Sequence, residues 1–461
     1  MSADRFGRVS ELASFLPANL RLGPVFWRWR RLIDRSETQS AEFWTGYQAR
    51  RLRGLLYFAR QTVPFYRRRI GSDPTRLSDR DVFRLLWEVP PLGKDDLREH
   101  FEELWSTAIP KWRRRVVTTG GSTGAPVAFG IERGTALAEW AFITSIWSRI
   151  GFRVGDRRLM VRGLALKGQV IRTRHLLDEL QVSAFHLSEE HLRPVWPDIQ
   201  GFGPPFLHGY PSALTAFTSW DEKAVRSLAV RGILCASEAL LPWQRSYLTE
   251  TLGAPISHWY GHSERLVLGG ECSHRTAFHM FPQYGFVETI DPDGGMCEDR
   301  PGEIVGTGFV SRAMPLIRYR TGDMGTLHRA TTPCRCGRTY PLLTDVQGRW
   351  RQEFLVGRTN APISPAAINF HDDSLVGVTG LQFVQESPGS TELRLTAGSA
   401  LRPEVVERIH RALVAKVAGE LDVQIRQVDR LEVLPSGKTP LIMQRAALPN
   451  PVLQRLADEH A

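Results

Sequence analysis

Lysine and cysteine are scarce in this chain of 461 residues, and long apolar runs are missing from it. No stretch reaches the roughly 18 apolar residues that a membrane span needs, and Asp4 and Glu11 stand where a secretion signal would be apolar. We therefore expect a cytoplasmic protein without membrane association. The five cysteines are an odd number, which argues against a disulfide framework and favours metal ligands or buried thiols.

The composition is that of an ordinary globular protein, with 42% hydrophobic and 23% charged residues, and the length predicts two or three domains. A net charge of +10 would by itself suggest a nucleic-acid partner. The surplus is uneven, however, because residues 1–115 hold 23 basic and 14 acidic side chains, whereas the remainder holds 36 and 35. We expect no nucleic-acid partner, since the excess charge is confined to the first quarter of the chain.

The hydrophobic pattern predicts three parts, 1–115, 116–348 and 349–461. The first part is mostly helical and basic, and its Trp- and Arg-rich stretch 26–31 fits a helix docked by its aromatic rings, or else a surface for a membrane or an acidic partner. In the second part short β-branched runs alternate with helical segments, which is typical of an α/β fold. The third part reads as a small α+β unit, with a strand pattern at 423–433.

A segment rich in glycine and hydroxyl groups follows the strand predicted at 116–119. Backbone N–H groups and hydroxyls in such a segment can surround an anionic phosphate, although the Gly-Lys-Ser/Thr ending of a Walker loop is missing. A generic turn between two elements is the alternative. The residues of the segment are Thr119, Gly120, Gly121, Ser122, Thr123 and Gly124.

Three further segments fit the same kind of ligand. The run 260–264 ends a predicted strand and closes on Glu264, a carboxylate able to hold Mg²⁺ beside phosphates. The run 318–323 places Asp323 after a tight turn, where it could accept both hydroxyls of a ribose. Lys438 is one of only six lysines, and it could neutralise charge that develops on a phosphoryl group. Each segment alone is typical of a surface turn, and their joint order favours a nucleotide site.

In this order the motifs resemble those of the adenylate-forming (AMP-binding) superfamily, and within it the phenylacetate-coenzyme A ligase and CapK-like branch. The pair Ser237-Glu238 resembles the adenine-contacting segment of the superfamily, and Gly348-Arg349 resembles its domain junction. The branch is indicated by the segments 207–212, 313–319 and 334–339. The resemblance implies an α/β fold with a large multi-layer N-terminal domain and a small, mobile α+β C-terminal domain.

The resemblance also implies a two-step reaction. A carboxylic acid, aryl or arylalkyl, would attack the α-phosphate of ATP, and the acyl-adenylate would then pass to coenzyme A. Lys438, Glu264 and Arg349 would be catalytic, with Glu264 also holding Mg²⁺, and residues 116–348 would form the AMP-binding core. Besides the phosphate loop, the ATP-binding residues would be Ser237, Glu238, Tyr260, Gly261, Ser263 and Asp323.

The domain junction departs from the pattern of the superfamily. The hinge acid that usually follows the Gly-Arg pair is replaced by Arg351-Gln352, with Glu353 next, which leaves the second step more open than the first. One alternative is transfer of the acyl group to an amine, a hydroxyl or a carrier-protein thiol in polysaccharide or secondary-metabolite biosynthesis. Another is a non-catalytic binding protein on the same fold, against which the intact Glu264, Asp323 and Lys438 count.

Few residues point to the acyl pocket. Tyr210, His262 and Trp140 are our candidates for substrate binding. Trp140 lies seven residues before Trp147, a spacing that favours a core stripe on a helix instead. His262 could equally be a hydrogen-bonded structural histidine.

Cysteine and histidine residues form a second candidate site. Cys334 and Cys336 are too close in sequence for an unstrained mutual disulfide, and Cys272 and His279 lie about sixty residues upstream. Thiolates and imidazoles are the ligands of closed tetrahedral Zn²⁺ sites, and members of the branch resemble this chain in having such a cluster. Buried free thiols are the alternative, and His274 competes with His279 as the ligand. A zinc ion here would stabilise the large domain and take no part in the chemistry.

Overall fold

The computed structural model describes residues 18–119, 126–164, 166, 168–329, 332–348, 354–368, 370, 374–375, 377–417, 419–433 and 439–446. Several predicted site residues fall outside these ranges and stay predictions: Gly120, Gly121, Ser122, Thr123, Gly124, Arg349 and Lys438. Within the described ranges, no helix combines the length and the apolar character that crossing a membrane requires.

The first part of the chain is helical, as the sequence predicts. Its helices are α2 (Ala18–Ser36), α3 (Ala41–Thr62), α4 (Pro64–Arg67), α5 (Asp79–Glu88) and α6 (Lys94–Glu99), with 3-10 turns at Pro74–Arg76 and Lys111–Arg113. The Ser40 hydroxyl caps α3 by accepting a 3.2 Å hydrogen bond from the amide of Phe43. Phe26 of α2 is fully buried while Arg28 and Arg31 of the same helix are exposed. The Trp- and Arg-rich stretch is therefore docked by its aromatic face.

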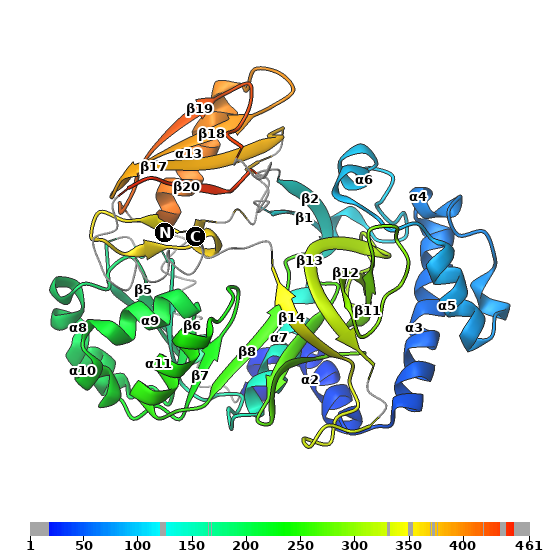
Figure 1. Ribbon diagram of the computed structural model, residues 1–461, viewed down its shortest axis with the longest axis horizontal. Helices are drawn as coiled ribbons and strands as arrows, with labels where there is room; N and C mark the ends of the chain where they lie inside the picture. Colours follow the sequence, from blue (N-terminus) through cyan, green and yellow to red (C-terminus); the bar gives the residue numbers. More distant parts are fainter. Residues whose placement is uncertain are drawn as a thin grey trace.

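One half of a twelve-stranded sheet carries parallel strands. These strands are β3 (Arg158–Arg162), β5 (Glu179–Ser183), β6 (Phe206–Gly209), β7 (Gly232–Cys235) and β8 (Ile256–Gly261), in the order β8-β7-β6-β3-β5, with β4 (Ile171–Arg174) antiparallel at the edge. Figure 1 shows the helices of this half in green around it: α8 (Glu189–Phe202), α9 (Pro211–Trp220), α10 (Glu222–Arg226) and α11 (Pro242–Leu252). Strands β5, β6 and β7 are buried along their whole length, as expected for a covered parallel sheet.

The other half of the large sheet is antiparallel. It contains β9 (Leu268–Cys272), β10 (Arg275–Met280), β11 (Gly285–Ile290), β12 (Pro301–Gly308), β13 (Tyr319–His328) and β14 (Leu342–Gln347), while β1 (Arg114–Thr119) and β2 (Val127–Glu132) form a separate hairpin. The helix α7 (Thr135–Ser148) follows this hairpin and packs against α2. Ring centroids of Trp29 on α2 and Phe142 on α7 lie 5.3 Å apart.

The prediction of a tight turn before Asp323 is wrong, because this residue lies inside β13. Arg320 pairs with Val305 and Met324 pairs with Glu303, so three residues of β13 stand opposite one residue of β12. Such a bulge bends a strand without ending it, and Gly322 supplies the left-handed backbone (φ 76°) within it. The sequence showed the glycine but not the pairing on either side.

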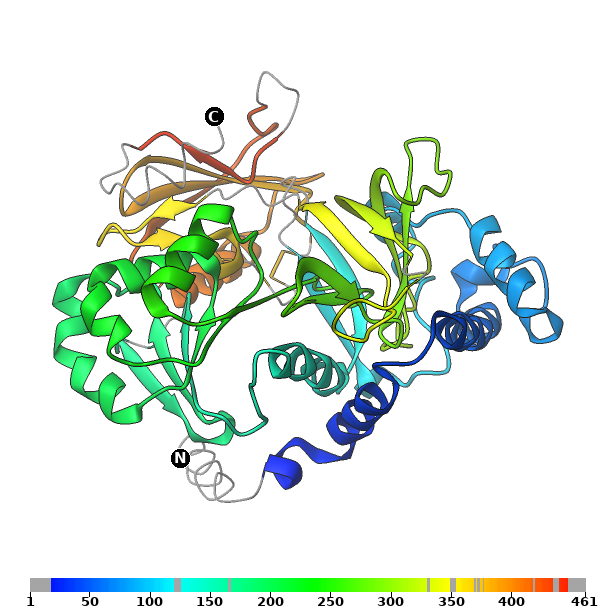
Figure 2. The same ribbon diagram turned by 60° about the horizontal axis from the view of Figure 1, so that its bottom comes forward.

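The C-terminal part is a small α+β unit, as predicted. Its elements are β15 (Leu355–Val356), β16 (Pro362–Ile363), α12 (Pro365–Ile368), β17 (Gly380–Ser387), β18 (Ser390–Thr396), α13 (Pro403–Val417), β19 (Asp422–Gln427) and β20 (Ile442–Gln444). The four-stranded sheet has the order β19-β18-β17-β20, and β19 is shorter than the strand pattern at 423–433 indicated. In both views this unit lies away from α3 and α5 and next to the parallel half-sheet (Figures 1 and 2). The division at residue 349 stays a prediction.

Candidate active site

Predicted site residues gather at one edge of the parallel half-sheet. Because β6, β7 and β8 are neighbours and run in the same direction, their carboxyl ends meet at that edge. Tyr210 follows β6, Ser237 and Glu238 follow β7, and the run 260–264 ends β8. Ligands of open parallel sheets bind outside the carboxyl ends of the strands. The fold therefore brings together residues that lie fifty positions apart in the sequence.

Tyr260 and Asp323 form the first pair of the site. The Tyr260 hydroxyl donates a 2.9 Å hydrogen bond to Oδ2 of Asp323, which joins the end of β8 to the bulge of β13. Burial and the neighbouring charge of Asp323 hold the pKa of Tyr260 well above its ordinary value, so the phenol stays a donor. The amide of Asp323 also donates to the hydroxyl of Thr321 at 3.1 Å. The first contact orients the carboxylate, and the second holds the backbone that carries it.

Glu264 is the second carboxylate at this edge, and it is 7% exposed. Its Oε1 accepts a 3.3 Å hydrogen bond from the hydroxyl of Tyr319, the first residue of β13. Its Oε2 lies 3.8 Å from Nδ1 of His262. Among the described residues this carboxylate accepts one hydrogen bond, and carboxylate oxygens are ligands that Mg²⁺ prefers, so Glu264 fits the predicted ion.

His262 directly follows the end of β8 and lies beside this carboxylate. Among the described residues neither ring nitrogen of His262 has a hydrogen-bond partner, although both are buried. The alternative of a hydrogen-bonded structural histidine therefore finds no support in the part of the chain that the structure describes. The role of His262 in substrate binding stays a prediction.

The pair Ser237-Glu238, which resembles the adenine-contacting segment of the superfamily, lies at the end of β7. Ser237 has a left-handed backbone (φ 70°), which is strained for a serine and typical of functional sites. Oε2 of Glu238 accepts a 3.1 Å hydrogen bond from the amide of Ser212. Burial raises the pKa of Glu238, outweighing the hydroxyls of Ser364 and Ser212 nearby. Oε1 of Glu238 is buried without a partner among the described residues, so it is available to a ligand donor.

Tyr210 and Trp140 do not lie in the same environment. The Tyr210 hydroxyl accepts a 2.9 Å hydrogen bond from Nη2 of Arg162, the last residue of β3, which sequence reasoning missed. Trp140 instead packs edge-on against Trp147, with ring centroids 5.0 Å apart, and the Arg158 guanidinium lies 5.1 Å from its ring centre. These contacts are those of a core residue, as the helical spacing favoured, so the substrate role of Trp140 stays a prediction.

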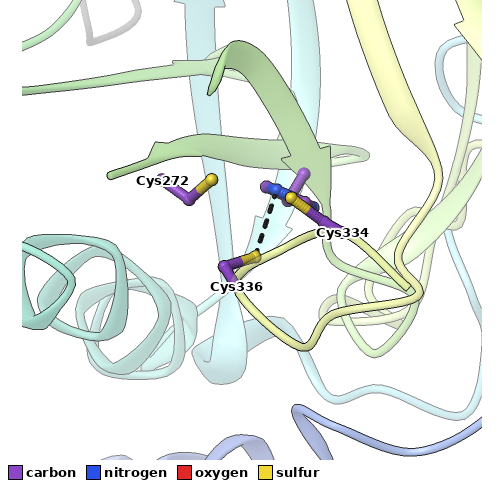
Figure 3. Close-up of side chains that lie close together, drawn as sticks. Cys272, Cys334 and Cys336 are labelled. Carbon is purple, nitrogen blue, oxygen red and sulfur yellow. Dashed lines mark hydrogen bonds between the residues drawn. The ribbon is translucent and has the colours of Figure 1, made fainter. Parts of the chain in front are cut away.

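The predicted zinc ligands come together away from this edge. One ligand atom from each of Cys272, His279, Cys334 and Cys336 lies within 4.8 Å of the other three, and Figure 3 shows the three sulfur atoms directed into a common space. Nε2 of His279 is 3.6 Å from Sγ of Cys336. Ligand atoms around tetrahedral zinc are separated by roughly 3.5 to 3.8 Å, so the group fits the ion after a small contraction. His274 is exposed and lies outside the group.

The loop of Cys336 also holds the junction between α2 and α3. Burial would raise the pKa of the Cys336 thiol, but the amide and side chain of Arg338 outweigh it and lower the value. Arg338 in turn pairs with Glu37 at 2.6 Å, and the Thr339 hydroxyl donates to the carbonyl of Gln39 at 2.6 Å. The candidate metal site thus lies next to the junction of α2 and α3.

The chain is similar in sequence to several known proteins. A phenylacetate-coenzyme A ligase of Thermus thermophilus is 27% identical over 444 residues, which cover 88% of this chain and 95% of the relative. A phenylacetate-coenzyme A ligase of Pseudomonas putida is 26% identical over 308 residues, covering 65% and 70%. Protein CapK of Staphylococcus aureus is 23% identical over 367 residues, covering 76% and 78%. No family model matches the chain.

Solved structures show the same fold. The 2-hydroxyisobutyryl-CoA ligase in complex with 2-HIB-AMP and CoA in its thioesterification state has a TM-score of 0.57 at 19% identity, covering 92% of this chain and 94% of that one. An open conformation of that ligase gives a TM-score of 0.54 at 20% identity, covering 88% and 93%. These similarities support the resemblance to the adenylate-forming superfamily, and within it to the phenylacetate-coenzyme A ligase and CapK-like branch, that the motifs indicated.

Proposed function

We propose that the protein activates a carboxylic acid with ATP and transfers the acyl group to coenzyme A. One observation carries the proposal: Asp323 and Glu264 are each held by a tyrosine at the edge of the parallel half-sheet, in a chain that matches 95% of a phenylacetate-coenzyme A ligase. The first step joins an oxygen of the substrate carboxylate to the α-phosphorus of ATP and breaks the bond to pyrophosphate. The second joins the acyl carbon to the thiol sulfur and releases AMP.

Each described residue has a part in binding. Asp323 would accept the ribose hydroxyls, since Tyr260 fixes its orientation, and the unpartnered Oε1 of Glu238 would accept a hydrogen bond from the adenine amino group. Glu264 would hold Mg²⁺, which when bound neutralises phosphate charge. Positioning and charge neutralisation supply most of the catalysis in phosphoryl chemistry of this kind. The phosphate loop, Arg349 and Lys438 keep their predicted roles.

The substrate is proposed to be an aryl or arylalkyl acid. Tyr210 at the carboxyl end of β6 supports a flat, aromatic pocket wall. The relatives from Thermus thermophilus and Pseudomonas putida both carry phenylacetate in their names. The acceptor is proposed to be coenzyme A for the same reason. The changed hinge sequence keeps an amine, a hydroxyl or a carrier thiol as the alternative acceptor. A cytoplasmic location fits either reaction.

Zinc is proposed as a structural ion at Cys272, His279, Cys334 and Cys336. The support is the mutual approach of the four ligand atoms and the burial of His279 and Cys334. A closed site with four protein ligands leaves no open position for substrate. The ion would therefore stabilise the fold.

The role of Lys438 gives a sharp experiment. Lys438→Ala should reduce acid-dependent exchange of pyrophosphate into ATP at least about 100-fold, because it removes the charge that faces the α-phosphate. Lys223→Ala on α10 is the matched control, since that lysine is exposed and remote from the sheet edge. Unchanged exchange in Lys438→Ala would refute the assigned role, provided that the wild-type protein catalyses exchange.

A further inference from the structure

Arg162 occupies an unusual position at the proposed acyl pocket. It is the last residue of β3, and β3 lies next to β6 in the sheet, so its side chain reaches Tyr210. Its guanidinium carbon is 4.7 Å from the centre of the Tyr210 ring, and Nη2 donates to the Tyr210 hydroxyl at 2.9 Å. The side chain is half-buried. A cation therefore borders the residue that we assign to the wall of the pocket.

This cation differs from Arg158, which lies four residues earlier on the same face of the same strand. Arg158 pairs with Glu179 at 2.8 Å, and both side chains are almost completely buried. No carboxylate of the described residues lies within 4.0 Å of Arg162. Among the described residues, the strand thus holds one arginine that is paired with a carboxylate and one that is not.

In the part of the chain that the structure describes, Glu238 and His208 are the titratable neighbours of Arg162 on which it acts electrostatically. Glu238 is near enough for Arg162 to lower its pKa, but burial keeps that value raised, so the carboxyl is a weak counterion. His208 of β6 is buried, and its pKa lies well below its ordinary value because of burial and the two arginines. It is therefore neutral beside Arg162. Among the described residues, only one of the five guanidinium N–H donors of Arg162 has an acceptor, the Tyr210 hydroxyl.

These observations say which ligand the site favours. A half-buried guanidinium with spare donors gains most from a carboxylate or similar anion, which its planar fork can bind through two hydrogen bonds. A purely hydrocarbon group against the same donors would remove water from them and return no hydrogen bond, which is unfavourable. The charge at the pocket wall therefore discriminates between acids.

We propose that Arg162 is a specificity-determining residue, and that the acid activated by this protein carries a second anionic group, a carboxylate, that pairs with the Arg162 guanidinium. The inference rests on the proposed acid activation and adds the class of substrate to it. The first carboxylate would face Glu264 and the nucleotide, and the second would lie at the carboxyl end of β3. Tyr210 would position the guanidinium between them.

Two acids of one scaffold test this proposal. Acid-dependent pyrophosphate exchange is measured with phenylacetate and with 4-carboxyphenylacetate, in wild-type protein and in Arg162→Gln. We expect kcat/KM in the wild type to be at least about tenfold higher for the diacid, since a charge-assisted pair is formed only there. Arg162→Gln should lower kcat/KM for the diacid about 10- to 100-fold relative to the wild type. Its kcat/KM for phenylacetate should stay within about threefold of the wild-type value.

Arg231→Gln is the matched control. Arg231 also lies over an aromatic ring, 5.2 Å from the centre of Phe206, but it precedes β7 and so lies at the opposite edge of the half-sheet. The Arg231→Gln variant should keep the wild-type preference between the two acids. Thermal unfolding should show that the wild type, Arg162→Gln and Arg231→Gln are all folded.

The outcomes separate this inference from the proposed function. Exchange with phenylacetate but no preference for the diacid, or an equal loss for both acids in Arg162→Gln, would overturn the role of Arg162 and leave acid activation standing. Absence of exchange with every acid in the wild type would overturn acid activation, and the inference with it.

Discussion

Two phenol groups hold the two carboxylates of the candidate active site. Tyr260 donates to Asp323 and Tyr319 donates to Glu264, and both tyrosines belong to strands of the large sheet. A carboxylate that is fixed by a rigid donor loses little conformational freedom when a ligand binds. The phenols are therefore positioning groups, and their removal should affect binding more than the chemical step.

The substitution Tyr260→Phe tests the positioning role of this phenol by removing its hydroxyl alone. The variant keeps the ring and removes one hydrogen bond, so we expect KM for ATP to rise about 2- to 10-fold with little change in kcat. Tyr247→Phe is a suitable control, because it removes a comparable 2.9 Å hydrogen bond to Glu222 on α10, away from the site. Steady-state kinetics with varied ATP give the answer, and equal KM values in Tyr260→Phe and the wild type would contradict the role.

Buried histidine produces a pH dependence of stability. Burial, together with the charge of Arg245, lowers the pKa of His258 to about 4. The 3.0 Å hydrogen bond of His258 to the carbonyl of Glu238 acts in the opposite direction but is outweighed. Because the folded-state value is depressed, the unfolded chain binds the extra proton between about pH 6.5 and pH 4. The stabilisation is complete above this window and is lost as the pH falls through it.

We therefore expect His258→Gln to reduce the slope of the free energy of unfolding against pH, between about pH 6.5 and pH 4, by up to about 1.4 kcal/mol per pH unit. Urea unfolding at several values between pH 7 and pH 4 measures this slope. His175→Gln should leave the slope unchanged, since His175 is exposed. A slope in His258→Gln as steep as in the wild type would show that another group titrates instead.

The residues of the site were predictable to different degrees. Glu264 and Asp323 stand in short motifs whose order along the chain carries the information. Arg162 stands in no such motif, and Tyr319 lies in the run 318–323 but was given no role there. Their partners lie 48 and 55 residues away and become neighbours only through strand pairing. Pairing across a sheet is set by the whole fold, so a local pattern cannot show it.

At the scale of elements, the cysteine loop connects two separate parts of the chain. The loop between β13 and β14 supplies two of the four proposed zinc ligands, and its Arg338 pairs with Glu37 at the end of α2. Ring centroids of Trp44 on α3 and Tyr340 in the loop lie 5.3 Å apart. A disturbed loop should therefore also loosen the junction of α2 and α3.

Cys334→Ser is predicted to abolish zinc binding and to lower the free energy of unfolding by roughly 2 kcal/mol or more. Protease cleavage near residues 36–40 should become faster, because the contacts of the loop with that junction depend on its conformation. Metal analysis and limited proteolysis check both effects.

Cys297→Ser serves as the control for that substitution. Cys297 is equally buried, at 2% exposed, but lies outside the ligand group, so zinc content should be unaffected. Wild-type protein purified without bound zinc would contradict the proposed site, and buried free thiols would then explain the cysteines.

Elements were predicted better than their irregularities. The first part of the chain was expected to be mostly helical, and α3 is one of the helices found there. The bulge in β13 was missed, because Gly322 before Asp323 is equally typical of a turn. The two possibilities differ only in whether strand pairing resumes, which a single segment does not reveal.

For the whole molecule, the docking of the C-terminal unit decides which residues enclose the site. Apolar residues of this unit, such as Leu355 and Ile363, belong to one continuous core with Leu159 and Val182 of the parallel half-sheet. The Thr359 hydroxyl donates to the carbonyl of Phe185 at 3.1 Å. The small unit thus lies against the loops that follow β3 and β5.

Gly163→Ala is predicted to disturb this docking. A Cβ at position 163 would lie 2.3 Å from the Cβ of Ala367 in α12, so the two parts would have to separate. We expect a larger radius of gyration in small-angle scattering and a loss of activity of about tenfold or more. Gly54→Ala on α3 meets nothing within 4 Å and should change neither quantity. Unchanged scattering in Gly163→Ala would show that the contact is adjustable.

The central claim is that this chain forms an acyl-adenylate and passes the acyl group to coenzyme A. The most direct measurement is pyrophosphate release by the wild-type protein with ATP and Mg²⁺ across a panel of aryl acids and diacids, with and without coenzyme A, followed by mass spectrometry of the products. The account predicts release that requires an acid, and a thioester that forms only when coenzyme A is present. Release that requires an amine and ignores coenzyme A would contradict the proposed acceptor, and no release with any acid would contradict the activation itself.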